Sequence, residues 1–291
     1  MALFTPQNGL STKTIRTLWG WAGLLAAVLL AVGPFLWLLS TSFKGAGDDL
    51  FATPVVWWPT QPTLANYVTV WKKIPFINYF LNSMVVTLLT VALNLTLSTL
   101  AAYALTCFTF WGRRAWLMLI LLTMLIPFQV VMLPLFLLVM RLGLTHESGW
   151  LAGWLGLALP FAISGFGIFF VREALKTLPP DMMEAAVLDG ANAVQRLVYV
   201  VVPLLKPTLA TLAIFTLLAS WGEFLWPSIV LSHQEQFTLP LGLVQLQGQF
   251  GSDWRLIAAG TLLSMVPVLV LFVLLQHWFL QSNATDAGVK G

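Results

Sequence analysis

The stretch EAAVLDGANAVQRLVYVVVPLLKP, residues 184–207, interrupts a chain that is otherwise strongly apolar. It carries Glu184, Asp189 and Arg196, and it lies between two long hydrophobic runs. Charged side chains are costly inside a lipid bilayer. We therefore expect this segment to lie outside the membrane, as a polar element between two spans.

Local signals in this segment predict a helix, a turn and a second helix. Residues 181–189 follow two prolines, and proline is accepted in the first turn of a helix but not in its interior. Gly190 is a suitable terminator, because glycine adopts left-handed backbone conformations without strain. Asn192 predicts the cap of a second helix over 193–202, which we expect to end or kink at Pro203.

The composition of the first predicted helix favours contact with another protein. The small residues Ala185, Ala186 and Gly190 leave the backbone accessible, and Glu184 and Asp189 supply charges that could pair with a partner. The alternative is an amphipathic helix lying on the membrane surface. Such a helix carries basic residues on one face and bulky aromatic residues on the other. This helix has neither, so we favour the docking interpretation.

The whole composition indicates a membrane protein. Only 9% of the 291 residues are charged and 59% are hydrophobic, and mean hydropathy is +0.88, whereas soluble proteins carry about a quarter charged residues. The net charge of +3 does not suggest nucleic-acid binding. The single cysteine, Cys107, excludes an intramolecular disulfide framework and a cysteine-based zinc site. The three histidines lack metal-ligand spacing, and we predict no metal site: His146, His233 and His277.

Hydropathy predicts an all-α, polytopic fold with six transmembrane helices. A bilayer core requires about 20 helical residues, and six apolar runs reach that length. Prolines within the runs are expected to kink helices, which is tolerated where neighbouring helices satisfy the freed carbonyls. The first run is too long for a signal peptide, so we expect an uncleaved span. The predicted spans are residues 18–40, 79–106, 115–140, 150–171, 207–231 and 255–280.

The distribution of Lys and Arg predicts the orientation. With the N-terminus inside, nine of these residues fall on inner segments and five on outer segments, which is the bias expected of cytoplasmic loops. Cytoplasmic segments are then the N-terminal residues 1–17, the docking loop at about 172–206 and the tail 281–291. Outer loops are expected at about 41–78 and 232–254.

The docking loop resembles the cytoplasmic EAA loop of ABC importer permeases. That motif is Glu-Ala-Ala, three residues, Gly, nine residues and Ile-x-Leu-Pro. Here residues 184–186 are followed by Gly190 and then by 200–203, with Val at both the Ile and Leu positions. Further segments resemble the carbohydrate branch of that family in order along the chain, although Gly222 is more often Asn there: residues 62–67, 189–191, 203–207, 221–227 and 288–291.

This resemblance covers nearly the whole chain after about residue 20 and is nearest to the shorter permease subunit of maltose-type sugar importers. It implies the type I ABC importer permease fold, in the cytoplasmic or inner membrane of a bacterium or archaeon. It also implies a second homologous permease, two ATP-binding subunits and an extracytoplasmic solute-binding protein as partners. The residues implied to couple this chain to the ATPase are Glu184, Ala185, Ala186, Asp189, Gly190 and Pro203.

The chain itself is not expected to be an enzyme. It has no GxxxxGK[ST] phosphate loop, so nothing in it is equipped to cradle ATP. We expect no cofactor on this chain, and ATP with Mg on the partner ATPase subunits.

Glu223 is the only acidic residue well inside a predicted span, which makes it a candidate for the translocation path. The alternative is a structural hydrogen bond to a neighbouring helix or to the partner permease. Trp221 and Trp226 flank it and are further candidates for the path. Tryptophan also anchors helices at membrane interfaces, which is its commoner role in membrane proteins.

The second outer loop is rich in Gln and Gly. The resemblance implies contact with a docked binding protein, and amide side chains suit hydroxyl recognition because each offers donors and an acceptor. The alternative is a flexible solvated loop. Candidate contact residues are Gln245, Gln247, Gly248 and Gln249.

Other classes of function remain open at this point. A secondary transporter or channel subunit would need no ATPase, but many such folds show inverted repeats, and none is visible here. An intramembrane enzyme would need a cluster of catalytic residues, which Glu223 alone does not supply. Disaccharides, oligosaccharides, glycosylated osmolytes and glycerol phosphate all remain possible solutes.

Overall fold

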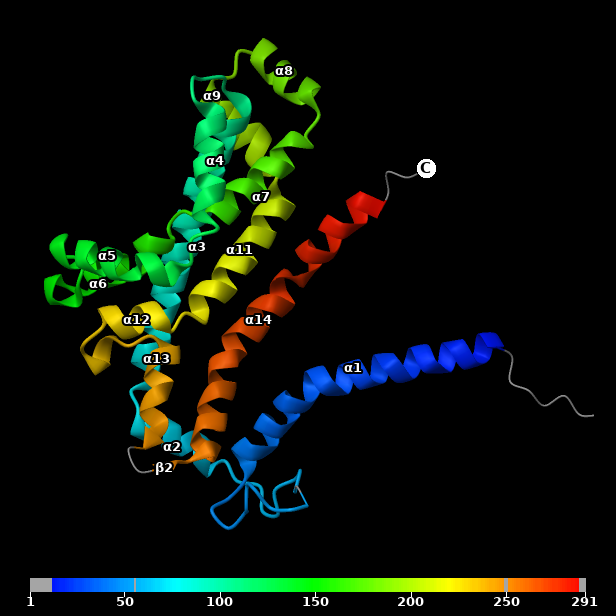
Figure 1. Ribbon diagram of the computed structural model, residues 1–291, viewed down its shortest axis with the longest axis vertical. Helices are drawn as coiled ribbons and strands as arrows, with labels where there is room; N and C mark the ends of the chain where they lie inside the picture. The colour runs from blue at the N-terminus through cyan, green and yellow to red at the C-terminus, as the bar shows by residue number, and fades with distance from the viewer. Residues whose placement is uncertain (1–11, 55, 249–250, 288–291) are drawn as a thin grey trace, which may run out of the picture. The chain divides into compact units, whose positions relative to one another are not determined.

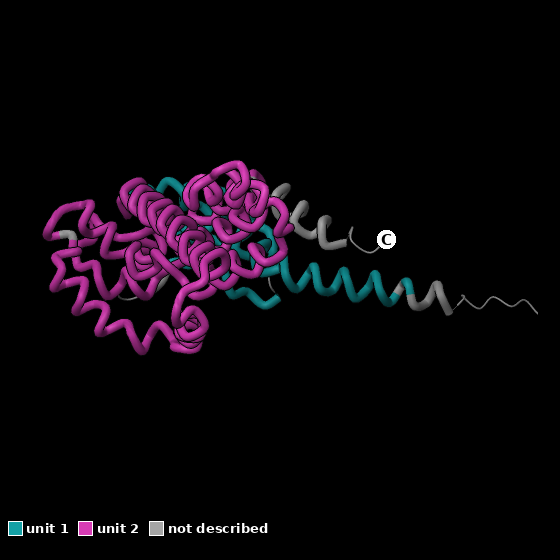
Figure 2. Tube along the Cα trace, turned by 90° about the horizontal axis from the view of Figure 1, so that it is seen from above, with its two compact units in different colours: residues 1–72, 248–263 teal, residues 73–247, 264–291 magenta. Residues whose placement is uncertain are grey.

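The computed structural model describes residues 12–54, 56–248 and 251–287, which are almost entirely helical (Figure 1). Two compact units divide the chain, residues 1–72 with 248–263 and residues 73–247 with 264–291 (Figure 2). The helices are α1 (Thr12–Phe43), α2 (Ala65–Lys73), α3 (Phe76–Cys107), α4 (Arg113–Thr123), α5 (Phe128–Arg141), α6 (Trp150–Ala158), α7 (Gly165–Lys176), α8 (Pro180–Leu188), α9 (Ala193–Gln195), α10 (Val202–Leu204), α11 (Lys206–Trp221), α12 (Leu225–Val230), α13 (Leu239–Leu243) and α14 (Trp254–Ala287).

The remaining regular elements are short. A π-helical stretch, Arg196–Val201, joins α9 to α10. Single 3-10 turns lie at His146–Ser148, Leu159–Phe161, Gln234–Gln236 and Val244–Leu246, and the strands β1 (Gln247–Gly248) and β2 (Gly251–Ser252) pair with each other. The all-α prediction is confirmed, with this two-residue pairing as the only sheet in the described residues.

Three of the six predicted spans are single helices in the structure, and three are broken. Trp19–Phe43, Phe76–Cys107 and Trp254–Leu274 are each long and apolar enough to cross a membrane. The other candidate spans are helix pairs bent by 100° between α4 and α5, by 57° before α7 and by 79° before α11. Six spans are therefore present if each bent pair counts as one.

Proline and side-chain caps explain these breaks. Pro127 precedes α5, and the residue before a proline is driven out of the helical conformation. Ser164 caps α7 by accepting a hydrogen bond from the Gly167 N–H at 3.0 Å. The predicted span over 207–231 is divided in the structure, because α11 ends at Trp221 and a separate helix, α12, begins at Leu225.

Several predicted loop boundaries also need correction. The outer loop predicted at 41–78 contains α2, and α3 already begins at Phe76. The loop predicted at 232–254 contains α13. α1 begins within the predicted N-terminal segment, and α14 extends into the predicted tail. α1 and α14 therefore run past their apolar runs, while α2 and α13 are separate short helices within the loops.

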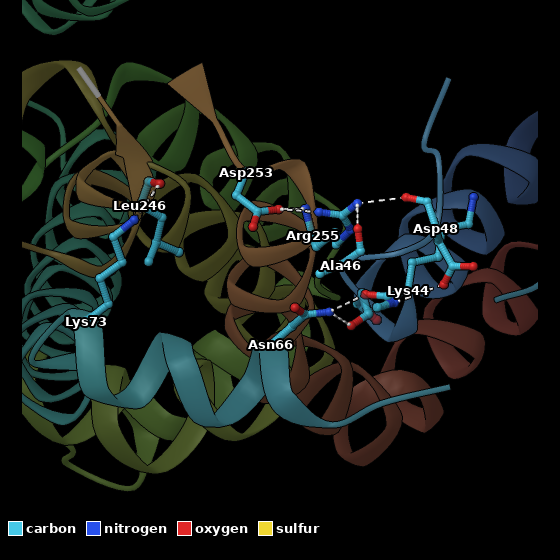
Figure 3. A network of polar contacts seen from close by, with 10 residues as sticks. Lys44, Ala46, Asp48, Asn66, Lys73, Leu246, Asp253 and Arg255 are labelled. Carbon is cyan, nitrogen blue, oxygen red and sulfur yellow. Dashed lines mark hydrogen bonds and ion pairs between the residues drawn. The ribbon is translucent and has the colours of Figure 1, made fainter. Parts of the chain in front are cut away.

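Polar contacts order the first outer loop within its own unit (Figure 3). Buried Lys44 donates its Nζ to the Val56 carbonyl at 2.7 Å, and Arg255 donates to the Asp48 carbonyl at 2.7 Å. Asn66 donates to the Ser42 and Lys44 carbonyls at 2.8 and 2.9 Å. This loop is thus fixed by hydrogen bonds to its own backbone.

The carboxylate of Asp48 holds two further points of this loop together. It accepts hydrogen bonds from the Thr60 hydroxyl and N–H and from the Gly45 N–H. These donors, the Thr60 hydroxyl foremost, hold the pKa of Asp48 below its ordinary 3.8. The carboxylate is therefore charged at neutral pH, and its stabilising contribution is lost only as the pH falls through the lowered pKa.

The larger unit is organised around α3, which packs against α7 and α11. Small polar side chains repeat along one face of α3 at helical spacing and are all buried. Gly167 lets α7 approach this face, because a Cβ there would lie 2.7 Å from the Ser98 Oγ and 3.0 Å from the Asn94 Oδ1. The polar residues of this face are Ser83, Thr87, Thr90, Asn94 and Ser98.

Candidate functional site

The docking loop folds as a helix, a sharp turn and a second helix. α8 follows Pro179 with Pro180 in its first turn, and Gly190 adopts a left-handed φ of 80° directly after the helix. Asn192 and Gln195 form a capping box, in which each side chain accepts from the other's backbone N–H, at 2.9 and 2.8 Å. The predicted helices on either side of Gly190 are confirmed.

The second helix of the loop is longer than predicted. It passes from α9 through the π-helical stretch into α10, so Pro203 lies inside the helical path and does not end it. The break comes at Leu205, where the direction changes by 79° into α11. The loop is therefore connected directly to a helix of the spanning unit.

Apolar packing and one hydrogen bond anchor this loop to α3 and α7. Val201 and Leu205 are buried in a cluster that includes Val171 of α7. The Tyr103 hydroxyl of α3 donates to the Ala193 carbonyl at 3.1 Å. Burial of branched side chains fixes the base of the loop, so its outer part is presented in one orientation.

The predicted coupling residues differ in their exposure. Glu184, Ala185, Asp189, Gly190 and Pro203 are exposed. Ala186 is buried, so its methyl group packs inward. Apolar side chains share the exposed surface, and Leu188 is 88% exposed. A shallow cavity of about 400 Å³ lies beside them, lined by Met183, Glu184, Val187, Leu188 and Arg196.

A second cavity lies within the spanning unit, and its wall combines hydroxyl and amide groups with apolar and aromatic side chains, including Phe161, Phe166 and Phe215. Its volume is about 410 Å³. Asn94 donates to the Phe161 carbonyl at 3.1 Å and to the Ser164 Oγ at 3.2 Å. Thr90 is buried, and its hydroxyl has no partner among the described residues. The polar lining residues are Thr90, Asn94, Ser164, Thr216, Ser220 and Glu223.

Glu223 both lines this cavity and caps a helix. It lies in the break between α11 and α12, and its Oε1 accepts from the Trp226 N–H at 3.0 Å. Its other oxygen has no hydrogen-bond partner within the described part of the chain. One carboxylate oxygen thus stabilises the break while the other is free to meet a solute or water.

Trp221 and Trp226 occupy packed positions that do not line this cavity. The indole of Trp221 donates to the Ser264 carbonyl at 3.1 Å. Trp226 is 1% exposed, and its indole donates to the Gly156 carbonyl at 3.1 Å. Both indoles already have hydrogen-bond partners, and both side chains are buried.

The candidate residues of the second outer loop lie in short turns. The Gln245 side chain accepts from Gln234 Nε2 at 3.3 Å. Gln247 and Gly248 form β1, and Gln249 lies outside the described residues. Among the described candidates, the structure gives the Gln245 side chain a hydrogen-bond partner within the same loop.

Comparison with known proteins decides the family. The family model "Binding-protein-dependent transport system inner membrane component" matches residues 94–283, which include the docking loop and every residue of the cavity lining except Thr90. The chain belongs to this family. It is a multi-pass membrane permease of a binding-protein-dependent transport system.

Individual relatives match the permease over most of its length. It is 32% identical to the arabinooligosaccharides transport system permease protein AraQ of Halalkalibacterium halodurans, over 92% of this chain and 95% of the relative. It is 34% identical to the sulfoquinovosyl glycerol transport system permease protein SmoH of Agrobacterium fabrum, over 91% of this chain and 92% of the relative.

A solved structure shares the fold. It is that of a bacterial ABC transporter involved in the import of the acidic polysaccharide alginate, and the TM-score is 0.80. The match has 25% identity and covers 94% of this chain and 100% of the other. The predicted resemblance to ABC importer permeases and the type I permease fold are thus confirmed. A secondary transporter, a channel subunit and an intramembrane enzyme are set aside.

No metal centre is found in the described residues of the permease, where no three His, Cys, Asp or Glu side chains form a group that could hold an ion. Sequence analysis missed the polar lining contributed by Thr90, Asn94, Ser164 and Thr216. A signal was present, because hydroxyl and amide residues recur at intervals of three and four within the apolar run over 79–106. Such a stripe on an apolar helix indicates a helix interface or a polar cavity.

Proposed function

We propose that this permease imports a sugar or glycosylated solute, driven by ATP hydrolysis in partner subunits. The observation that carries the proposal is the cavity within the spanning unit, in which apolar and aromatic side chains surround hydroxyl and amide groups. Such groups offer both donors and acceptors, which matches the hydroxyl groups of a sugar. The names of the similar permeases support the sugar class, since they refer to arabinooligosaccharides, galactooligosaccharides, diacetylchitobiose and lactose.

The docking loop is the proposed contact with an ATPase subunit. Exposed Glu184, Asp189 and Gly190 surround an apolar surface at one end of the unit, and Figure 1 shows α8 and α9 at that end. Two ATPase subunits carrying ATP and Mg, a second homologous permease and an extracytoplasmic solute-binding protein complete the proposed assembly. The N- and C-termini and this loop then face the cytoplasm.

A continuous mechanical connection leads from this loop to the cavity. The helix that begins at Ala193 continues to Leu204 and turns into α11, and α11 supplies the cavity residues Thr216 and Ser220. A displacement of α8 by a partner would therefore move a wall of the cavity. This linkage accounts for alternating access without chemistry on this chain.

Reconstitution tests the proposed function. The tagged permease, together with the subunits that co-purify with it, should give proteoliposomes that accumulate a labelled oligosaccharide only with ATP inside and binding protein outside. Proteoliposomes lacking ATP are the control. Uptake that continues without ATP, or a purified complex without an ATPase, would contradict the proposal.

Substitution of Glu223 tests whether the solute passes through the cavity that Glu223 lines. Glu223→Gln should retain the helix cap, because the amide oxygen can still accept from the Trp226 N–H. Uptake should fall about fivefold, since a hydrogen bond to a charged group contributes about 1 kcal/mol more than a neutral one.

Glu223→Ala provides the matched comparison, because it removes both the charge and the cap and should also cost about 1 kcal/mol of stability. Initial uptake rates and thermal unfolding of the purified complex measure the two effects separately. Unchanged uptake in the Gln variant would assign Glu223 a structural role alone.

A further inference from the structure

A third cavity lies at the end of the larger unit that also carries the docking loop, and it is surrounded by arginines. Its volume is about 540 Å³, and Arg113, Arg114 and Arg172 line it together with Thr109. Arg172 belongs to the last turns of α7, whose chain continues into α8. The cavity plays no part in the coupling surface or in the polar cavity described above.

Positive charge at this cavity is poorly compensated within the chain. The Arg113 guanidinium donates to the Phe108 carbonyl at 3.3 Å, and neither Arg113 nor Arg114 forms an ion pair with any described residue. Arg172 pairs with Glu173 at 2.7 Å, but Glu173 is shared with Lys176 at 2.8 Å. No carboxylate lines the cavity itself. The arginines therefore leave a net positive site.

Two further observations favour an anion at this position. The buried Nε–H of Arg172 has no hydrogen-bond partner among the described residues, and leaving such a donor unsatisfied is costly. Arg113 and Arg114 also begin α4, whose N-terminus carries the positive end of the helix dipole. Two cations at that end repel the dipole unless an anion lies between them.

The surroundings of the cavity identify the source of the anion as a lipid. Trp111 is 97% exposed, and Trp116 in the first turns of α4 is also exposed, as expected of tryptophans at headgroup depth. Beyond them, α4 presents exposed apolar side chains, including Met118 and Leu122. Acyl chains would pack along this face while the phosphate occupies the cavity.

We propose that the cavity formed by Arg113, Arg114 and Arg172 binds the phosphate of an anionic phospholipid. Basic pockets between transmembrane helices bind the headgroups of such lipids. The site lies beside the docking loop, so bound lipid would stabilise the end of α3 and α7 to which the loop is anchored. The proposal does not depend on which solute the permease carries.

Native mass spectrometry of the purified transporter complex tests this site. The complex is exposed to equal amounts of phosphatidylglycerol and phosphatidylcholine, and the retained lipids are counted. The native complex should retain phosphatidylglycerol in preference. In the Arg113→Gln, Arg114→Gln double variant, the ratio of retained phosphatidylglycerol to phosphatidylcholine should fall about fivefold for each arginine removed. Neither arginine has an ion pair to break, and thermal unfolding of the variant complex verifies its fold.

Matched variants separate this site from general charge effects. Arg141→Gln removes an exposed arginine at the end of α5, outside the cavity, and should keep the lipid preference. Replacing Arg113 and Arg114 by lysine should retain most of it. Equal phosphatidylglycerol retention by the native complex and the double glutamine variant would overturn the proposal.

Two further experiments on the same complex distinguish a lipid from two other occupants of the cavity, a free anion and a partner protein. Excess inorganic phosphate should leave phosphatidylglycerol bound, because the acyl chains also contact α4; full displacement by phosphate would indicate a free-anion site and overturn the lipid assignment. A photo-crosslinker in place of Leu117, which also lines the cavity, should label lipid. Labelling of an ATPase subunit there would show that a protein covers the cavity and would also overturn it.

Discussion

Gly190→Trp is expected to abolish ATP-driven uptake while the permease remains in the membrane. Gly190 has a φ of 80°, and no atom lies within 4 Å of the position that a Cβ would take. The indole would therefore project from the exposed turn into the surface on which we propose that the ATPase docks. Left-handed backbone costs a non-glycine residue about 1–2 kcal/mol, a local strain too small to unfold the chain.

Two alanine variants separate steric block from backbone strain. Gly190→Ala adds the strain without the indole and should retain most of the uptake. Gly143→Ala adds similar strain at a φ of 65° outside the docking loop and should retain it as well. Uptake into proteoliposomes, membrane abundance by immunoblot and ATPase stimulation by the binding protein are the measurements. Normal uptake by Gly190→Trp would refute the docking role.

Gly167→Leu is expected to cause the largest loss of stability. A Cβ at this position would lie 2.7 Å from the Ser98 Oγ and 2.8 Å from the Ser164 Oγ, so α7 would be forced away from α3. Overpacking of this kind costs about 1–3 kcal/mol. The hydrogen bonds of Asn94 and Ser164 would be lost in addition, each contributing about 1 kcal/mol.

Gly33→Leu is the matched control for this substitution. Gly33 lies in the apolar helix α1, and nothing lies within 4 Å of its ideal Cβ position. Both variants replace a helical glycine by leucine, so a larger loss in Gly167→Leu reports the crowding between α7 and α3 together with the hydrogen bonds lost there. Denaturant unfolding of the detergent-solubilised complex and membrane yield provide the comparison. Equal stability of the two variants would show that α3 and α7 are not held together at Gly167.

Local rules predicted the docking loop well, because its structure depends on neighbouring residues. The proline before α8, the left-handed Gly190 and the capping box of Asn192 each set the end of a helix through residues within about four positions of themselves. The family was also accessible from sequence, since motifs such as 184–190 and 203–207 match in order. The two helices on either side of Gly190 were confirmed because their ends are set by nearby residues.

Kinks were expected at prolines, but which spans break and by how much was not predicted, because hydropathy measures apolar content and not hydrogen bonding. The run over 115–140 is continuously apolar, yet α4 and α5 meet at 100° next to Pro127. The run over 207–231 contains the break that Glu223 caps. A proline or a glycine bends a span sharply only where other parts of the fold satisfy the backbone groups that the break releases. Asn94 does this by donating to the Phe161 carbonyl.

The dual use of side chains at these breaks limits how the permease could be re-engineered for other solutes. Asn94, Ser164 and Glu223 face the cavity, and each also satisfies a backbone group where a helix is interrupted. Directed evolution at these positions would trade selectivity against folding yield. Thr90 and Ser220 line the same cavity without capping a break, so libraries that vary them first should retain more folded transporters.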